Sequence, residues 1–361
     1  MKDIVEPVKK PRNSYIDIIK LVFSIMIVLF HFGEGIAPSG RIAVEGFFMI
    51  SGYLMMVKIS QNDRVPKNRY TGFQTIEFII HKLKSLLVYL VPSFMLTIVV
   101  DTLYYNKPIL DVLKALPLYF FDVFPLNALG YRGNYIIGIS WYLSSMFFSL
   151  AVLFPICVKY KEKFILKVGI PIALLIYGYL SCSIGTLAVP VWYETLGKVQ
   201  IPMGLLRGIA GCTLGCVVFV IVEEIQRRKI EKTIRRKSLL LEMGGGAYFL
   251  YIVSCYPASR YDYLMIFVLF GLLIIGISGI TGLQHWYSFT WTRQLNICSI
   301  ILVLNHYHWG QILSSKYGEN KGDHFLEYCL YVLCSSAIVY LSVWIYKRIQ
   351  DKKRNRKTMI E

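Results

Sequence analysis

Residues 14–33 read SYIDIIKLVFSIMIVLFHFG, and this stretch decides the fold. About twenty residues, nearly all apolar, match the length of an α-helix that crosses the hydrocarbon core of a bilayer. The run is longer than the apolar core of a secretory signal peptide, contains Asp17 and Lys20, and lacks a small-residue cleavage site. We therefore expect a retained transmembrane helix here rather than a cleaved leader.

Nine further apolar runs follow along the 361 residues, which are 55% hydrophobic and only 17% charged. Because lipid offers no partner to a backbone N–H or C=O, each run is expected to form a helix. The ten predicted helices span 14–33, 42–60, 82–104, 136–157, 164–182, 201–223, 239–256, 261–281, 296–315 and 325–346. The sequence thus predicts an all-α, polytopic transmembrane bundle at 14–346, flanked by cytoplasmic tails at 1–13 and 347–361.

The positive charge of the chain lies in short blocks between the apolar runs. A formal net charge of +17 is compatible with nucleic-acid binding, but this distribution is how membrane topology is encoded, and we expect no nucleic-acid partner. Of the 39 Lys and Arg residues, 28 fall on the side of the predicted bundle that holds both termini and 8 on the other. The asymmetry predicts that both termini are cytoplasmic.

The eight cysteines lie mostly within apolar runs, and none shows zinc-like or CxxC spacing. We interpret them as packing residues that do not fix a redox compartment. No metal site and no tightly bound cofactor are expected.

The longest predicted outer segment, 105–135, is rich in Tyr and Phe. One interpretation is an aromatic belt at the membrane interface, where such side chains are enriched. The other is a platform on which sugar rings stack. The sequence alone leaves both open.

The first predicted helix carries ionisable and polar side chains. Burying such groups in a membrane costs free energy, so they usually mark a functional site or a structural pair. Lys20 and His31 are eleven residues apart, which places them within ~20° of one direction and about 16 Å apart along the axis. Asp17 and Ser24 fall on the same stripe. An imidazole can take a proton from a hydroxyl, and a lysine can hold a phosphate or carboxylate. The alternative is a structural Asp17–Lys20 pair with His31 as a packing residue.

The second predicted helix adds a carboxylate, Glu45, just inside the outer side of the membrane and near the level of His31. A carboxylate within reach would orient the imidazole and stabilise its protonated form. Ser51 and Gly52 permit close approach of another helix. Arg41, at the outer rim, is also compatible with an ordinary interface anchor.

These two helices together resemble the N-terminal signature of the membrane acyltransferase-3 family. The resemblance rests on Asp17-Ile-Ile-Lys20, on His31, and on the run VEGFFMISGYL at 44–54. Lys20 stands where the family usually has Arg, and His31 keeps the family's spacing of ten intervening residues. Later stretches resemble further family segments in the same order: WYLS at 141–144, RGIAGCTLG at 207–215 and 299–306, which ends in a histidine.

The resemblance implies ten helices in one domain of the bacterial plasma membrane. It implies transfer of an acyl group, most simply acetyl, from cytoplasmic acyl-CoA to a hydroxyl of a surface polysaccharide or its lipid-linked precursor. Membrane lipids would surround the chain, and an oligomer is compatible with the sequence.

The resemblance also implies roles for individual residues. His31 would be the general base or a transient acyl carrier, and Glu45 would orient it. Arg207 would contact the pantetheine arm or the acyl carbonyl, with a structural carboxylate pairing as the alternative. Two groups complete the expectation: CoA-phosphate ligands at Lys20, Lys82 and Lys84, and supporting residues at Asp17, Ser24, Arg41, Tyr142 and His306.

Two other classes of protein, a transporter and a non-catalytic scaffold, are alternatives for a chain with these features. A transporter or flippase of lipid-linked saccharides would also have about ten helices and buried charges, but such proteins often show matching helix breaks in two halves. Gly244, Gly245 and Gly246 could break one helix, and no matching break is evident in the other half. A non-catalytic scaffold would not need a cation and an imidazole aligned on one helix.

Overall fold

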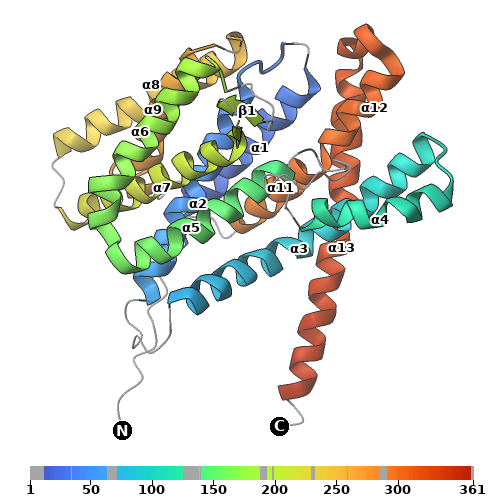
Figure 1. Cartoon of the computed structure of the whole chain (residues 1–361), viewed down its shortest axis with the longest axis horizontal. Helices are drawn as coiled ribbons and strands as arrows, with labels where there is room; N and C mark the ends of the chain where they lie inside the picture. Colours follow the sequence, from blue (N-terminus) through green and yellow to red (C-terminus); the bar gives the residue numbers. More distant parts are fainter. Residues whose placement is uncertain are drawn as a thin grey trace.

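The structure is a computed structural model that describes residues 12–33, 35–62, 71–124, 138, 140–187, 193–196, 199–228, 232–257, 259–283 and 291–358. Helices dominate the described part of the chain (Figure 1). They are α1 (Ser14–Phe32), α2 (Ala43–Asn62), α3 (Thr71–Tyr104), α4 (Ile109–Val123), α5 (Ser140–Phe164), α6 (Ile170–Ser183), α7 (Met203–Arg227), α8 (Lys232–Cys255), α9 (Tyr261–Ser278), α11 (Thr292–Asn305), α12 (Tyr307–Tyr317) and α13 (Phe325–Thr358).

Eight helical stretches of the described residues are long and apolar enough to cross a membrane. One of them, residues 140–183, contains two predicted spans, α5 and α6, joined by a π-helical turn at Ile165–Gly169. Another predicted span, 296–315, is divided between α11 and α12. The prediction of a polytopic transmembrane helical bundle is therefore confirmed.

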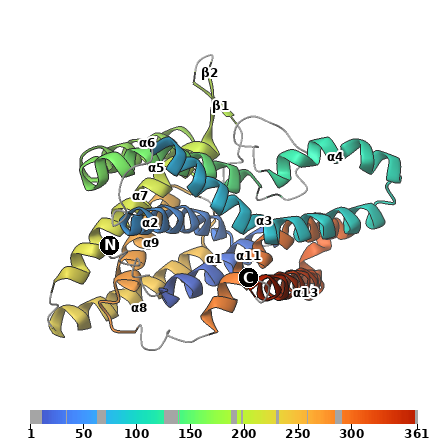
Figure 2. The same ribbon diagram turned by 90° about the horizontal axis from the view of Figure 1, so that it is seen from below.

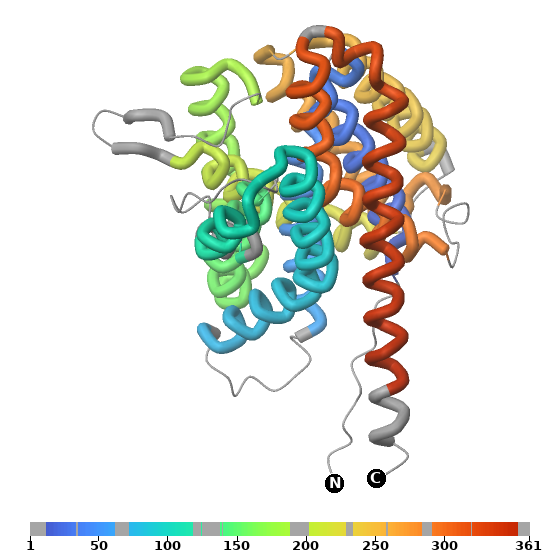
Figure 3. Tube along the Cα trace, turned by 90° about the vertical axis from the view of Figure 1, so that its right-hand side faces the viewer, coloured from blue at the N-terminus to red at the C-terminus, as the bar shows by residue number. Residues whose placement is uncertain are grey.

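The bundle begins and ends at the same side of the membrane. At one end of α1, the Ser14 hydroxyl accepts a hydrogen bond from Thr292 Oγ1 at the start of α11. At the other end, the Val28 carbonyl accepts one from the hydroxyl of Tyr328, near the start of α13. From there α13 runs back along the full length of the bundle (Figure 3). The start of α1 and the end of α13 consequently lie at one end, as an even number of crossings requires.

Four helices extend at least seven residues further than the apolar runs predict. Helix α3 begins at Thr71 rather than at 82, and α8 begins at Lys232 rather than at 239. Helix α5 ends at Phe164 rather than at 157, and α13 ends at Thr358 rather than at 346. Hydropathy indicates only the part of a helix that lies in lipid. The helical backbone hydrogen bonds continue through polar turns beyond that part, so the helices are longer than the apolar runs. The proposed division between a transmembrane domain and a tail at 346 falls inside α13 and stays a prediction.

Two elements were not predicted. Helix α4 lies within the aromatic segment 105–135, and a two-stranded antiparallel hairpin, β1 (Tyr193–Leu196) and β2 (Val199–Pro202), precedes α7. Figure 2 shows both elements at the periphery of the bundle. Among the described side chains of α4, four large apolar ones are exposed: Ile109, Leu110, Leu113 and Leu116. Residues 125–137 lie outside the described residues, so the two interpretations of the aromatic segment stay predictions.

The centre of the core is the contact between α2 and α7, which depends on two glycines. A Cβ on Gly52 would collide with the Cys212 carbonyl, and a Cβ on Gly215 would collide with the Met49 carbonyl. Small residues at these positions let the two backbones touch, as in other membrane helix pairs.

We expect Gly52→Ala to destabilise the protein by about 1–3 kcal/mol, since overpacking forces the two backbones apart. Thermal unfolding of the detergent-solubilised protein checks this. Gly72→Ala is the matched control, because a Cβ there meets nothing within 4 Å. Equal melting temperatures for the two variants would contradict the close contact.

Candidate functional site

A cavity of about 840 Å³ penetrates the bundle. Its wall includes residues of α1, α2, α3, α5, α7, α11 and α12, so most of the predicted spans contribute to one internal space. Lys20 and His31 both line it. The helical periodicity of α1 therefore correctly predicted that these two residues share a face.

Two lysines lie at the end of the cavity nearest to the start of α1. Lys20 Nζ donates to Asn296 Oδ1 at 3.1 Å, and Lys82 lines the same space. On α3, Lys82 is followed by Ser85 and Tyr89, which also line the cavity. Spacings of three and four residues place all three on one helical stripe.

Lys84 does not line this cavity and is exposed. The step of two residues from Lys82 to Lys84 turns the helix by about 200°, so the two lysines point to opposite sides. Lys84 therefore lies on the other side of α3 from the cavity-lining Lys82, and its role as a CoA-phosphate ligand stays a prediction.

Asp17 pairs with Arg12 and not with Lys20. Arg12 Nε and Nη2 donate to the two Asp17 carboxylate oxygens at 2.5 and 2.8 Å. This hydrogen bonding raises the pKa of Arg12 above that of a free guanidinium. The alternative of a structural Asp17–Lys20 pair is therefore not observed, and the Lys20 side chain lines the cavity.

Ser24 attaches α1 to α11. Its Oγ lies 2.7 Å from Ser299 Oγ and donates to the Ser299 carbonyl at 3.0 Å, and its side chain is fully buried. Ser299 in turn donates to the Lys20 carbonyl at 3.0 Å. The hydroxyl on the polar stripe thus holds two helices together at the level between Lys20 and His31.

The His31 ring lines the cavity about three helical turns away from Lys20. Its Nδ1 lies 2.9 Å from the Ile27 carbonyl oxygen. Because a carbonyl can only accept, Nδ1 carries the hydrogen and Nε2 of the neutral ring keeps its lone pair. The backbone of α1 therefore fixes the tautomer that a general base or a nucleophile needs.

His306 packs against His31 in an edge-to-face arrangement, with ring centroids 4.8 Å apart. It stands where α11 ends and α12 begins, so the predicted continuous helix 296–315 is broken at this residue. His306 Nδ1 is 2.8 Å from the Val303 carbonyl, and its buried Nε2 has no hydrogen-bond partner in the described part of the chain. Sequence reasoning placed His306 among the supporting residues, and its ring does contact His31.

Glu45 does not orient His31. Arg207 Nε donates to Glu45 Oε1 at 2.7 Å, and the Tyr177 hydroxyl donates to Glu45 Oε2. Glu45 is fully buried and Arg207 is 3% exposed. The predicted Glu45–His31 contact was wrong because equal membrane depth does not imply a shared helix interface; the close α2–α7 packing directs Glu45 toward α7.

Arg207 nevertheless lines the cavity, with its guanidinium 5.2 Å from the Trp141 ring centroid. The structural carboxylate pairing considered from sequence is the observed one. A further hydrogen bond runs from Arg207 Nη1 to the Leu187 carbonyl at 3.3 Å.

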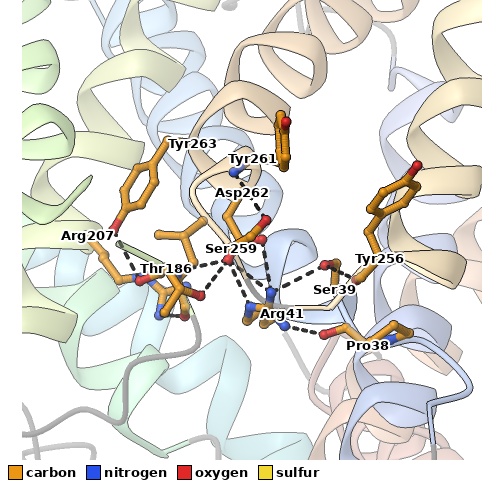
Figure 4. Close-up of polar contacts among 11 residues, drawn as sticks. Pro38, Ser39, Arg41, Thr186, Arg207, Tyr256, Ser259, Tyr261, Asp262 and Tyr263 are labelled. Carbon is orange, nitrogen blue, oxygen red and sulfur yellow. Dashed lines mark hydrogen bonds and ion pairs between the residues drawn. The ribbon is translucent and has the colours of Figure 1, made fainter. Parts of the chain in front are cut away.

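Arg41 forms the second buried ion pair at the outer end of the cavity (Figure 4). Its Nη2 donates to both Asp262 carboxylate oxygens, at 2.9 and 3.0 Å, and its Nε donates to Oδ2 at 3.1 Å. Asp262 also accepts from Thr186 Oγ1 and from the Leu187 amide. Arg41 is thus a buried structural residue as well as a cavity-lining one, rather than an interface anchor.

Tyr142 lines the cavity between the two ends. Its ring packs 4.8 Å from that of Phe48, and its hydroxyl donates to the Met146 sulfur at 3.7 Å. This placement supports the sequence expectation that Tyr142 belongs to the site region.

Sequence reasoning missed Tyr177, Asp262 and Asn296 as site residues. Asp262 could have been recognised from the sequence, since a carboxylate at the start of an apolar run usually pairs with a cation. Tyr177 and Asn296 offered none, because an isolated Tyr or Asn in an apolar run is usual at helix interfaces.

Among known proteins, one family model matches, with the description of an acyltransferase domain of the acyltransferase-3 type. It covers residues 13–347, from the residue before α1 into the second half of α13. No curated protein and no solved structure matches the chain.

Proposed function

The chain belongs to the acyltransferase-3 family. On that premise we propose that it transfers a short acyl group, most simply acetyl, from cytoplasmic acyl-CoA. The acceptor would be a hydroxyl of a cell-surface polysaccharide or its lipid-linked precursor. It is a multi-pass membrane acyltransferase. The observation that carries the rest is the single cavity lined by both Lys20 and His31. Such a cavity would let a donor enter from one side and react with an acceptor at the other.

Two features support a CoA thioester as the donor. The end of the cavity that holds Lys20 and Lys82 lies on the side of both chain termini, which the positive-inside rule assigns to the cytoplasm. The separation between Lys20 and His31 is about 16 Å along α1, a distance that suits a ligand with an anionic head and a long, thin arm.

His31 would act at the far end of that arm through Nε2. The acceptor oxygen attacks the thioester carbonyl carbon while its proton passes to Nε2, and the C–S bond then breaks. The imidazolium returns the proton to the departing thiolate, so no net proton is released. If Nε2 instead attacks the carbonyl carbon, the C–S bond breaks, CoA leaves as the thiolate and the acyl group stays on Nε2. The acceptor oxygen then displaces Nε2 from the acyl group, and the hydroxyl proton passes to the thiolate.

Donor binding is tested at Lys20. We expect Lys20→Ala to raise KM for acetyl-CoA about tenfold, since it removes a charged group that binds a phosphate. Lys20→Arg should retain much of the activity, because the family usually has Arg there and the charge is kept. Acyl transfer by the purified protein in nanodiscs measures both, and an unchanged KM for Lys20→Ala would contradict a donor-binding role.

The rival function is transport of lipid-linked saccharides. The described residues show one helix break beside the cavity, at His306, and the His306 ring contacts His31. A transporter often has matching broken helices in its two halves instead. A fixed imidazole tautomer has an obvious use in acyl transfer and none in flipping a lipid.

We propose the plasma membrane as the location.

A further inference from the structure

The C-terminal helix α13 reaches the cytoplasmic end of the cavity. Lys347 Nζ donates to the Tyr89 hydroxyl at 2.8 Å and lies 4.9 Å from the Tyr89 ring centroid. Tyr89 itself lines the cavity. Lys347 is half-buried, whereas Tyr346 and Arg348 on either side of it are exposed. Among these neighbours, Lys347 is therefore the residue that α13 turns toward the cavity.

Lys347 forms no ion pair with a carboxylate in the described part of the chain, and the same holds for Lys20 and Lys82, which line the cavity. The carboxylate of α1, Asp17, accepts hydrogen bonds from Arg12. Lys20 and Lys82 face the same space, where like charges repel one another and a bound anion relieves that repulsion. The arrangement suits a ligand with several negative charges rather than one.

The Lys347 ammonium also keeps free donor capacity. An ammonium has three N–H groups, and the Tyr89 hydroxyl takes one. The Tyr89 contact holds the flexible lysine stem against α3, on the same helical stripe as Lys82 and Ser85. Two donors therefore remain available beside Tyr89, at the cavity wall.

We propose that Lys347 binds a phosphate of the acyl-CoA donor, with Tyr89 as its positioning residue. The proposal rests on the proposed function and adds α13, from the opposite end of the sequence, to the donor site. The nucleotide end of CoA carries phosphates on both its diphosphate bridge and its ribose. A third lysine at the rim would bind this end and leave the acyl group free to reach His31.

The test compares two donors that differ only in the nucleotide. Acetyl-CoA carries the phosphates, and S-acetylpantetheine lacks them but keeps the same thioester and arm. We expect Lys347→Ala to raise KM for acetyl-CoA about tenfold, with kcat and the kinetics of S-acetylpantetheine unchanged. Lys347→Arg should restore most of the affinity. Arg348→Ala is the matched control, because it removes the same charge from an exposed neighbour that packs on Trp344, and should change KM less than about twofold.

Three outcomes would overturn the proposal. An equal loss with both donors would mean that Lys347 only holds α13 against α3. A loss that appears in nanodiscs with anionic lipid and disappears in phosphatidylcholine would assign the lysine to a lipid headgroup. An unchanged KM would remove it from the donor site. If the wild-type protein used neither thioester, the proposed function itself would fail, which is a distinguishable result.

Discussion

We expect His31→Ala to lower the rate of acyl transfer by about a thousandfold, the size typical of removing a positioned general acid–base group. The imidazole lines the cavity, and the Ile27 carbonyl fixes its hydrogen on Nδ1. Alanine leaves no basic atom at that position, and no other described residue is hydrogen-bonded to the His31 ring. Turnover of acetyl-CoA with an accepted glycan, measured on the purified protein in nanodiscs, gives the rate.

His81→Ala is the matched control for this substitution. His81 is an exposed histidine of α3 that does not line the cavity, so its loss removes an imidazole without touching the site. Its activity should stay within about twofold of the wild type, as for most surface substitutions. Normal turnover by His31→Ala, with normal expression and insertion, would contradict the assignment of the base.

We expect Glu45→Ala and Arg207→Ala each to lower the free energy of unfolding by about 3–5 kcal/mol, because either substitution leaves a buried charge without its partner. The two side chains are 0% and 4% exposed and lie 2.7 Å apart. Both variants should also lose transfer activity, since Arg207 lines the cavity. Thermal or denaturant unfolding of the detergent-solubilised protein measures the loss.

The double variant separates the pair from general packing damage. Removing both partners should cost less than the sum of the single losses, with a coupling of about 1–3 kcal/mol. Glu224→Ala is the control, because its ion pair with Arg228 is exposed and should contribute less than about 1 kcal/mol. Strict additivity of the two buried substitutions would contradict the ion pair.

The positions of the helices could be predicted because the membrane imposes a strong local signal. An apolar run near twenty residues has few alternatives to a spanning helix, and every predicted run contains a helix in the structure. The limits of α3 and α13 could not be predicted in the same way, since their polar turns lie beyond the lipid. The break at His306 has no local signal such as proline or glycine.

The candidate site was predictable along one helix and unpredictable between helices. Lys20 and His31 share a face of α1 because eleven residues nearly complete three turns, and both line the cavity. The partner of Glu45 depends on how α2 packs against α7. The depth of a residue in the membrane, which the sequence does indicate, does not show which helices are neighbours. For the same reason, Lys347 could not be connected to Tyr89, 258 positions earlier.

The mass of the surface glycans tests the transferase assignment most directly. Glycans from a deletion strain should lack the mass of one short acyl group per modified residue, and the wild-type gene should restore it. Complementation with His31→Ala should leave the glycans at the same cell-surface level but without the acyl mass. Restored acylation with His31→Ala, or loss of the glycan itself in the deletion strain with no acyl difference, would contradict acyl transfer and favour transport.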